Sequence, residues 1–176
     1  MDKKELRSRV RAALKQMSEA EKTQQSTMLA LALVVHPSVR DAKVLALFSP
    51  LPDEPQIGEI IDILAEGRTV LLPRIEGEVM NFYKYAPSSL HKGAFGIMEP
   101  AEGTPAEPAE IDAMVVPGVV FTPDGKRMGR GKGFYDRYMS QPGFRARKIG
   151  VCYAQQIADA LPCEPHDIAM DEVISR

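Results

Sequence analysis

The residues with the clearest chemical potential lie between Lys126 and Asp136, where glycine alternates with cations. The stretch reads Lys-Arg-Met-Gly-Arg-Gly-Lys-Gly-Phe-Tyr-Asp. Glycines let backbone N–H groups approach a ligand closely, and Lys and Arg supply charge-assisted donors. An apolar run, residues 115–121, precedes the stretch and a short potential helix follows it, which is typical of phosphate-binding loops. The sequence therefore predicts an anion- or phosphate-binding loop.

The loop departs from the common nucleotide-binding signatures. A Walker A motif needs a glycine, four residues and then Gly-Lys-Ser/Thr, whereas Gly131 and Lys132 are followed here by Gly133. A dinucleotide fingerprint needs a different third glycine spacing and an acid about 20 residues further on. The segment Lys132–Tyr135 faintly resembles an RNA-recognition strand motif, but the aromatic pattern does not continue. The residue chemistry alone therefore leaves the anionic ligand unnamed.

The charge distribution favours a small anionic ligand. The net charge of the 176 residues is −2, but cations concentrate in residues 2–15 and 126–148, which leaves the remainder acidic. A nucleic-acid track would need a broad basic face, so we expect no nucleic-acid partner. Asp136 ends the loop, and its carboxylate could hold Mg²⁺, cap a helix or pair with a cation.

Apolar periodicity places these residues in an α/β protein. It predicts helices over residues 2–17, 19–35, 55–65, 134–139 and 155–161. It predicts strands over residues 43–48, 70–72, 79–85, 113–116, 148–153 and 171–174, with 79–85 in an antiparallel pair. Because helices alternate with apolar strands, we expect a three-layer α/β/α sandwich with a mixed, mostly parallel central sheet. At this length we expect one domain over residues 1–176.

Two further segments are candidates for contact with the same ligand. Lys3, Arg7 and Arg11 recur every fourth residue on the first helix, either as a solvated face or as polyphosphate ligands. The segment Ser49–Glu54 follows a buried strand, and ligands of open α/β sheets bind at that edge. Glu54 could serve such a ligand, or it could lie in the first turn of the next helix.

The sequence has the features of a cytoplasmic protein. Its charged start leads into a helical pattern, which is unlike a signal peptide. No apolar run reaches the length of a membrane span, so we expect no membrane partner. Cys152 and Cys163 lack metal-ligand spacing and are expected as reduced thiols. The expectation for the oligomeric state is a monomer.

Several motifs together resemble the 5-formyltetrahydrofolate cyclo-ligase family, also called 5,10-methenyltetrahydrofolate synthetases. The most specific is residues 117–136, where Pro-Gly-Val-Val-Phe precedes the run Gly-Lys-Arg-Met-Gly-Arg-Gly-Lys-Gly-Phe-Tyr-Asp. Weaker similarities in family order occur at residues 3–7, 48–54, 67–74, 95–97 and 166–173. Thr122 stands where the family commonly has Asp, and Phe134 replaces a frequent Tyr.

The resemblance implies an ATP- and Mg²⁺-dependent ligase that converts 5-formyltetrahydrofolate to 5,10-methenyltetrahydrofolate and releases ADP and phosphate. It implies catalytic roles for Arg7, Arg130 and Lys132, and Mg²⁺ ligands in Asp136 and Asp167. The implied ATP-binding residues are Lys3, Lys4, Glu5, Leu6, Arg7, Arg127, Met128, Gly129, Arg130, Gly131, Lys132, Gly133, Phe134 and Tyr135. The implied substrate-binding residues are Ser49, Glu54, Phe95, Arg130, Gly131, Lys132, Gly133 and Phe134.

Two other functions fit the residue patterns taken alone. One is a non-catalytic phosphate- or RNA-binding α/β domain. The other is a sugar-phosphate isomerase or acyl-transfer enzyme of related architecture, which would need a catalytic carboxylate in a strand-end loop but no ATP. On the residue pattern alone, Phe95 between two glycines is typical of a hydrophobic plug rather than a ligand platform.

Overall fold

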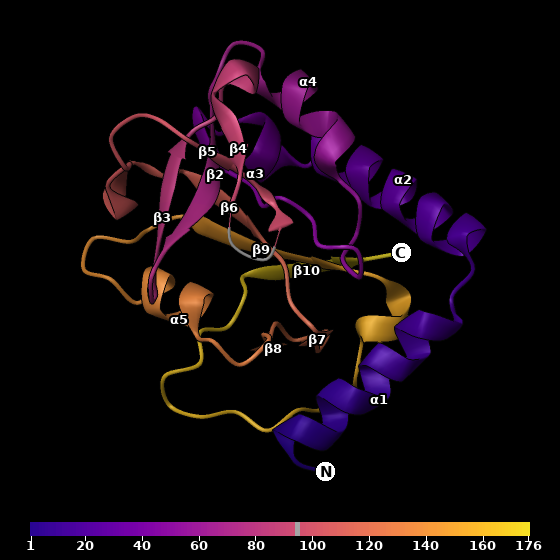
Figure 1. Ribbon diagram of the computed structural model, residues 1–176. Coiled ribbons are helices and arrows are strands. Elements are labelled where there is room, and N and C mark those ends of the chain that lie inside the picture. The colour runs from indigo at the N-terminus through magenta and orange to yellow at the C-terminus, as the bar shows by residue number, and fades with distance from the viewer. Residues whose placement is uncertain (94–95) are drawn as a thin grey trace.

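A six-stranded sheet forms the centre of the molecule in the computed structural model, which describes residues 1–93 and 96–176 (Figure 1). In spatial order the strands are β10 (Glu172–Ser175), β9 (Arg147–Cys152), β6 (Ala113–Val116), β1 (Val44–Ala46), β2 (Thr69–Glu76) and β3 (Val79–Lys84). Neighbouring strands within this sheet are parallel, except that β2 and β3 are antiparallel. The prediction of a mixed, mostly parallel sheet is confirmed.

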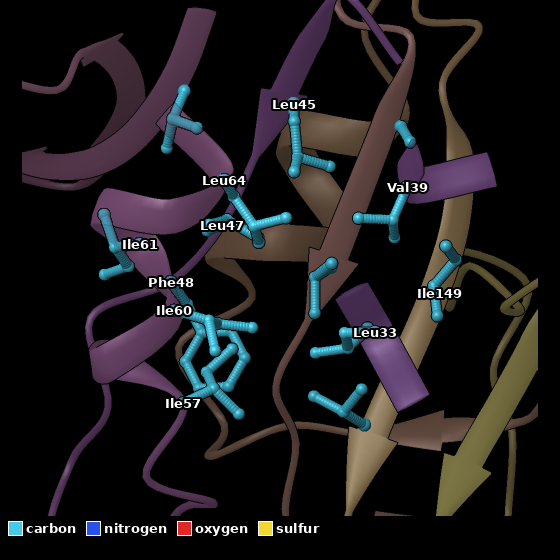
Figure 2. Close-up of a cluster of buried hydrophobic side chains, with 14 of the residues drawn as sticks. Leu33, Val39, Leu45, Leu47, Phe48, Ile57, Ile60, Ile61, Leu64 and Ile149 are labelled. Atoms are coloured by element: carbon cyan, nitrogen blue, oxygen red, sulfur yellow. The ribbon is translucent and has the colours of Figure 1, made fainter. Parts of the chain in front are cut away.

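One face of the sheet is covered by three helices. They are α2 (Glu19–Val35), α3 (Pro37–Arg40) and α4 (Ile61–Ala65), the last preceded by a short 3-10 helix (Gly58–Ile60). Figure 2 shows how Leu33 of α2 and Leu64 of α4 pack with sheet residues such as Leu45 and Ile149. Burial of these apolar side chains removes their surface from water and stabilises this layer.

The opposite face of the sheet is covered by α5 (Phe134–Met139) and by a small hairpin, against which α1 (Lys3–Gln16) packs. Alternate strand residues, such as Met114 and Val116, turn to this face and pack with Tyr138 of α5. The hairpin consists of β7 (Val120–Phe121) and β8 (Arg127–Met128). Leu6 and Val10 of α1 pack against it, so the first helix lies beside the chain that enters the glycine loop.

The remaining short elements lie outside the central sheet. They are β4 (Leu90–Lys92) paired with β5 (Met98–Pro100), and 3-10 helices at Pro87–Ser89, Pro108–Glu110 and Ala154–Gln156. Neither the β4–β5 hairpin nor the β7–β8 hairpin was predicted, because strands of two or three residues are too short to show a periodicity.

The helix predicted over residues 55–65 begins later than expected, so the prediction is wrong for residues 55–57. Regular structure begins only at Gly58. The backbone N–H of Gln56 donates to Ser26 Oγ at 2.9 Å, and the Gln56 carboxamide donates to the carbonyls of Leu51 and Glu54 at 2.8 Å each. These bonds offer the segment partners outside a helix, and they hold it as a loop.

The helix predicted over residues 155–161 is also shorter than expected, with a 3-10 turn at Ala154–Gln156 only. The chain beyond this turn runs beside β7. Ile157 forms a parallel bridge with Phe121, and the N–H of Ala158 donates to the Phe121 carbonyl at 2.9 Å. Pairing with a strand far away in sequence therefore replaces the local helix.

Strand β2 extends past the end predicted at Leu72 and includes Pro73. Its neighbour β1 pairs with β2 only as far as Leu71. Pro73 has no N–H to donate, and the structure places it where the parallel neighbour has already ended. The antiparallel pairing predicted for residues 79–85 is confirmed by the β2–β3 ladder.

Candidate active site

A cavity of about 440 Å³ opens at the carboxyl ends of β1 and β6. Its wall is built from α1, from the segments after these two strands, from β2 and β3, and from the glycine loop. The described residues that line it are Lys3, Arg7, Phe48, Ser49, Leu51, Glu54, Pro73, Ile75, Met80, Ile97, Glu99, Pro117, Gly118, Arg127, Met128, Gly129, Arg130, Gly131, Lys132, Gly133, Phe134, Tyr135, Asp136, Glu164, His166 and Asp167. Most of the predicted site residues therefore share one cavity.

The first helix, α1, contributes Lys3 and Arg7 to the cavity wall. Arg7 Nε donates to the carbonyl of Gly129 at 2.8 Å, and Lys3 Nζ donates to Asp167 Oδ2 at 2.9 Å. Arg11 is exposed and does not line the cavity among the described residues. The two cations one turn apart therefore belong to the site, whereas the third belongs to a solvated face.

The glycine loop passes through backbone conformations that favour glycine. Gly131 has a φ of 104° and Gly133 a φ of 71°, both in the left-handed region. Arg137 fixes the loop from outside by donating to the carbonyls of Lys132 and Glu78, at 2.8 Å each. The following helix α5 has only six residues, so the cations must supply most of the positive potential here.

Arg127 differs from the other cations of the loop because its side chain is buried. It is 7% exposed, its Nε donates to the Pro117 carbonyl at 2.7 Å, and its guanidinium lies 5.1 Å from the Tyr135 ring centre. Burial lowers the pKa of the Arg127 guanidinium, although nearby Asp136 acts in the opposite direction. Arg127 therefore shapes the cavity wall, and only a small part of its side chain is accessible to a ligand.

Glu54 provides a buried carboxylate on the opposite wall. It is 4% exposed, and its Oε1 accepts the N–H of Leu51 at 2.8 Å. Burial raises the pKa of this carboxyl, although the Leu51 N–H and the Arg130 cation favour its charged form. Glu54 is not part of a helical turn, so the alternative of a helix-dipole role does not apply. Ser49 Oγ donates to the Met98 carbonyl at 2.9 Å, which keeps its acceptor lone pairs free for a ligand.

Arg130 links the two walls. Its guanidinium donates to both carboxylate oxygens of Asp53, and its Nη2 lies 3.5 Å from Glu54 Oε2. Lys132 is exposed and lines the cavity. The structure thus brings Arg7, Arg130 and Lys132, the three predicted catalytic residues, to the same cavity.

Other predicted residues lie elsewhere. Leu6 packs in the core against the β7–β8 hairpin, and Glu5 accepts the Asp2 N–H in the cap of α1. Lys4 is exposed, and none of these three lines the cavity among the described residues. The family resemblance implied them as part of the continuous segment 3–7, but helical geometry turns them away from the cavity. Phe95 lies outside the described residues.

Three acidic residues were missed from the sequence: Glu99 and Glu164 line the cavity, and Asp53 bonds to Arg130 but does not line it among the described residues. Glu99 is 2% exposed and accepts the N–H of Ile75 at 2.9 Å. Asp53 precedes Glu54 in the strand-end loop, which could have suggested it. Glu99 lies on the unpredicted β5, so no sequence signal pointed to it.

Asp136 and Asp167, the predicted Mg²⁺ ligands, both line the cavity. Asp136 Oδ1 accepts the N–H of Ile168 at 3.0 Å, and Asp167 Oδ2 accepts from Lys3 and from the Glu164 N–H. Burial raises the pKa of Asp167, but the bonds from Lys3 and Glu164 outweigh it and lower the pKa overall. Asp167 also clusters with His166 and Glu164, with ligand atoms within 4.8 Å of one another. Hard carboxylate oxygens are the ligands Mg²⁺ prefers, so the donor chemistry fits.

The sequence was compared with known protein families and curated proteins. Residues 1–176 match the 5-formyltetrahydrofolate cyclo-ligase family. The chain belongs to this family. It is 29% identical to the mouse 5-formyltetrahydrofolate cyclo-ligase, over 98% of this chain and 92% of the relative. It is 34% identical to the cyclo-ligase of Mycolicibacterium smegmatis, over 76% of this chain and 73% of the relative.

Solved structures agree with the cyclo-ligase family. The Aquifex aeolicus 5,10-methenyltetrahydrofolate synthetase superimposes with a TM-score of 0.89 at 34% identity, covering 99% of this chain and 90% of that one. The Mycoplasma pneumoniae synthetase gives a TM-score of 0.78 at 28% identity, covering 99% and 98%. Membership of a ligase family decides against the alternative of a non-catalytic phosphate- or RNA-binding domain. Within the described residues, no helix is long and apolar enough to cross a membrane.

Proposed function

We propose that this chain converts 5-formyltetrahydrofolate to 5,10-methenyltetrahydrofolate with consumption of ATP and release of ADP and phosphate. Family membership supports this reaction, and so does the similarity to the mouse cyclo-ligase and the Aquifex aeolicus synthetase. The structural observation that carries the proposal is the cavity in which Arg130 joins a cationic glycine loop to the buried carboxylate of Glu54. A two-substrate reaction needs two such walls facing one space.

The cationic wall is the proposed ATP site. Lys3, Arg7 and the segment 127–135 lie along it. Phosphoryl transfer requires positioning and neutralisation of negative charge rather than a protein nucleophile. Arg7, Arg130 and Lys132 carry the positive charge that the transferred phosphoryl group needs, and the backbone N–H groups at Gly131 and Gly133 can approach its oxygens.

The opposite wall is the proposed folate site. Glu54 accepts hydrogen bonds from N–H groups of the pterin, and the Ser49 hydroxyl oxygen lines the same region. Apolar side chains of Pro73, Ile75 and Met80 supply a surface on which a flat ring can pack. Discrimination follows because a ligand without N–H donors would leave Glu54 Oε2 with only its 3.5 Å contact to Arg130.

The chemistry proceeds in two steps that the two walls align. The formyl oxygen attacks the γ-phosphorus of ATP, the bond to the β–γ bridging oxygen breaks, and ADP leaves. The resulting imidate phosphate is attacked at its carbon by N10, and N10 releases its proton to solvent. The carbon–oxygen bond then breaks, and phosphate leaves as the methenyl bridge forms. The protein holds the formyl oxygen and the γ-phosphate at reacting distance, which converts an encounter in solution into an intramolecular step.

Mg²⁺ is proposed to accompany ATP. Asp136 and Asp167 would hold it, and it would neutralise phosphate charge when bound. Although burial raises the pKa of the Asp167 carboxyl, the bonds from Lys3 and Glu164 lower it overall, which favours the charged form that binds a cation.

A cytoplasmic monomer is the proposed working form. Residues 1–176 provide both walls from one chain, which supports a monomer acting as one domain. Cys152 and Cys163 are free thiols in the structure, and free thiols are typical of reducing compartments.

The test is direct. The purified protein is mixed with MgATP and 5-formyltetrahydrofolate, and the absorbance of the methenyl product is followed while ADP is measured in parallel. We expect equal amounts of both products, no reaction without ATP, and loss of activity in EDTA that excess Mg²⁺ restores. Folded protein that produces no methenyl absorbance would contradict the proposal. Activity that persists in EDTA would contradict the proposed role of Mg²⁺.

A further inference from the structure

A buried hydrogen-bond network lies directly behind Glu54. Tyr153 is 0% exposed, and its hydroxyl donates to the Glu54 backbone carbonyl at 3.1 Å. Ser26 Oγ of α2 lies 3.2 Å from the same hydroxyl, and it accepts the backbone N–H of Gln56 at 2.9 Å. Because Tyr153 has a single hydroxyl hydrogen, Ser26 must donate to the Tyr153 oxygen. Every hydrogen in the network then has one acceptor.

Two side chains of this network hold the backbone of the Glu54 loop, one at Glu54 and one two residues further along. The Tyr153 hydroxyl holds the carbonyl of Glu54, and Ser26 holds the N–H two residues further on. Within the loop, the Glu54 carboxylate accepts the Leu51 N–H, and the Glu54 N–H donates to the Leu51 carbonyl at 3.0 Å. This turn and the bonds from the Gln56 carboxamide to the Leu51 and Glu54 carbonyls fix the shape of the loop. Tyr153 and Ser26 fix its place relative to β9 and α2.

Tyr153 is itself anchored to the cavity wall next to the cationic loop. Its backbone N–H donates to Gln156 Oε1 at 2.8 Å. The Gln156 side chain, 1% exposed, donates in turn to the carbonyls of Gly118 at 2.7 Å and Val119 at 3.2 Å. Gly118 lines the cavity. The turn from Tyr153 to Gln156 therefore connects the Glu54 loop with the segment that follows β6.

We propose that Tyr153 and Ser26 are positioning residues that aim the Glu54 carboxylate at the folate ring. This inference rests on the proposed function of the cavity. Neither residue is among the described residues that line the cavity, so each acts through the Glu54 loop rather than through contact with a substrate. A buried carboxylate recognises N–H donors only within a narrow range of distance and angle, and a loop released from its anchor no longer holds that geometry.

The experiment compares Tyr153→Phe and Ser26→Ala with the matched control Tyr85→Phe. Tyr85 also loses a hydroxyl bond, the 2.6 Å contact with Asp62 Oδ1, but it does not line the cavity among the described residues. For each protein we would measure kcat, the KM of each substrate, Tm, and the Kd for 5-formyltetrahydrofolate alone. We expect KM and Kd for the folate to rise about threefold to tenfold in both test variants, the loss typical of a buried hydrogen bond. We expect KM for ATP to stay within about twofold, and Tyr85→Phe to keep all these constants.

Several outcomes would overturn the inference. A Tyr153→Phe variant whose folate KM and Kd equal those of Tyr85→Phe would do so, because the position of the Glu54 carboxylate would then not depend on the Tyr153 hydroxyl. A fall in Tm together with equal rises in the KM for ATP and the KM for the folate would also overturn it, because the Tyr153 hydroxyl would then have only a structural role. If Ser26→Ala does not fold, Tyr153→Phe decides, since it keeps the packed ring. If the wild type binds the folate but makes no product, the proposed reaction fails, whereas the Kd comparison still tests the positioning role.

Discussion

Arg130 Nη2 lies 3.5 Å from Glu54 Oε2, so a cation of the glycine loop contacts the buried carboxylate of the strand-end loop. Asp53, next to Glu54, accepts hydrogen bonds from the same guanidinium. One side chain therefore belongs to both walls of the cavity. A residue in this place is expected to influence the binding of both substrates.

Arg130→Ala should raise the KM for ATP and the KM for 5-formyltetrahydrofolate together, by about tenfold each. ATP loses a cation, and Glu54 loses the charge that partly offsets its burial. Steady-state kinetics with each substrate varied in turn measures both effects. A change confined to one substrate would contradict a role shared between the walls.

Lys132→Ala should lower kcat/KM for ATP by roughly a hundredfold with little change in stability. The Lys132 side chain is exposed at the cavity, so its removal costs little packing. Lys126→Ala is the matched control, because Lys126 is an exposed cation of the same stretch that does not line the cavity among the described residues. Thermal unfolding is measured alongside the kinetics. Equal losses of activity and stability in Lys132→Ala would show that the loop cation is structural.

Arg127→Met should destabilise the fold by about 3 kcal/mol, whereas Arg130→Ala should cost less than about 1 kcal/mol. Arg127 is buried and holds the Pro117 carbonyl, and Asp136 lies 4.0 Å from its guanidinium. Removing it leaves these partners unsatisfied. Urea unfolding of the two variants and the wild type gives the free energies of unfolding. Similar free energies of unfolding for both variants would mean that the buried contacts of Arg127 stabilise the fold no more than the exposed contacts of Arg130.

Glu54→Gln should raise Tm at pH 7, with a gain that shrinks as the pH falls toward 4.5. Burial raises the pKa of the Glu54 carboxyl above its ordinary value of 4.5, so the folded state binds this proton more tightly than the unfolded chain. Stability from this group is therefore present at low pH and is lost as pH rises through the window above 4.5. Gln cannot ionise and avoids that loss.

The measurement for this prediction is Tm against pH for the wild type, Glu54→Gln and the exposed control Glu59→Gln. Glu59→Gln should follow the wild type throughout. A constant difference between Glu54→Gln and the wild type at every pH would contradict the raised pKa.

The two cysteines should react at very different rates with a thiol reagent. Cys152 is 0% exposed, and burial raises the pKa of its thiol to about 12, whereas Cys163 is exposed. Since the thiolate is the reactive form, the folded protein should titrate one thiol and the unfolded protein two. In Cys163→Ser the folded protein should titrate none. Two fast thiols in the folded wild type would contradict the burial of Cys152.

Local sequence patterns determined much of the fold and part of the site. The capping box formed by Ser18 and Glu21 starts α2 where it was predicted, because both partners lie within one turn. The alternation in residues 79–85 predicted an antiparallel strand, because side-chain direction follows the backbone period. The glycines at 131 and 133 predicted a special loop, because their backbone conformation is itself a local property.

Tertiary packing decided which residues of equal type face the ligand. Arg127 and Arg130 lie in the same stretch, yet the β7–β8 hairpin buries the first and leaves the second between the walls. Likewise, Tyr153 bonds to Glu54 and Ser26 to Gln56 only because the fold brings α2 and the end of β9 behind one loop. Contacts between segments far apart in the chain depend on how the layers pack, and short-range periodicity carries no information about that packing. The sequence by itself therefore determined the elements and the chemistry of the loop, and the tertiary structure decided its geometry.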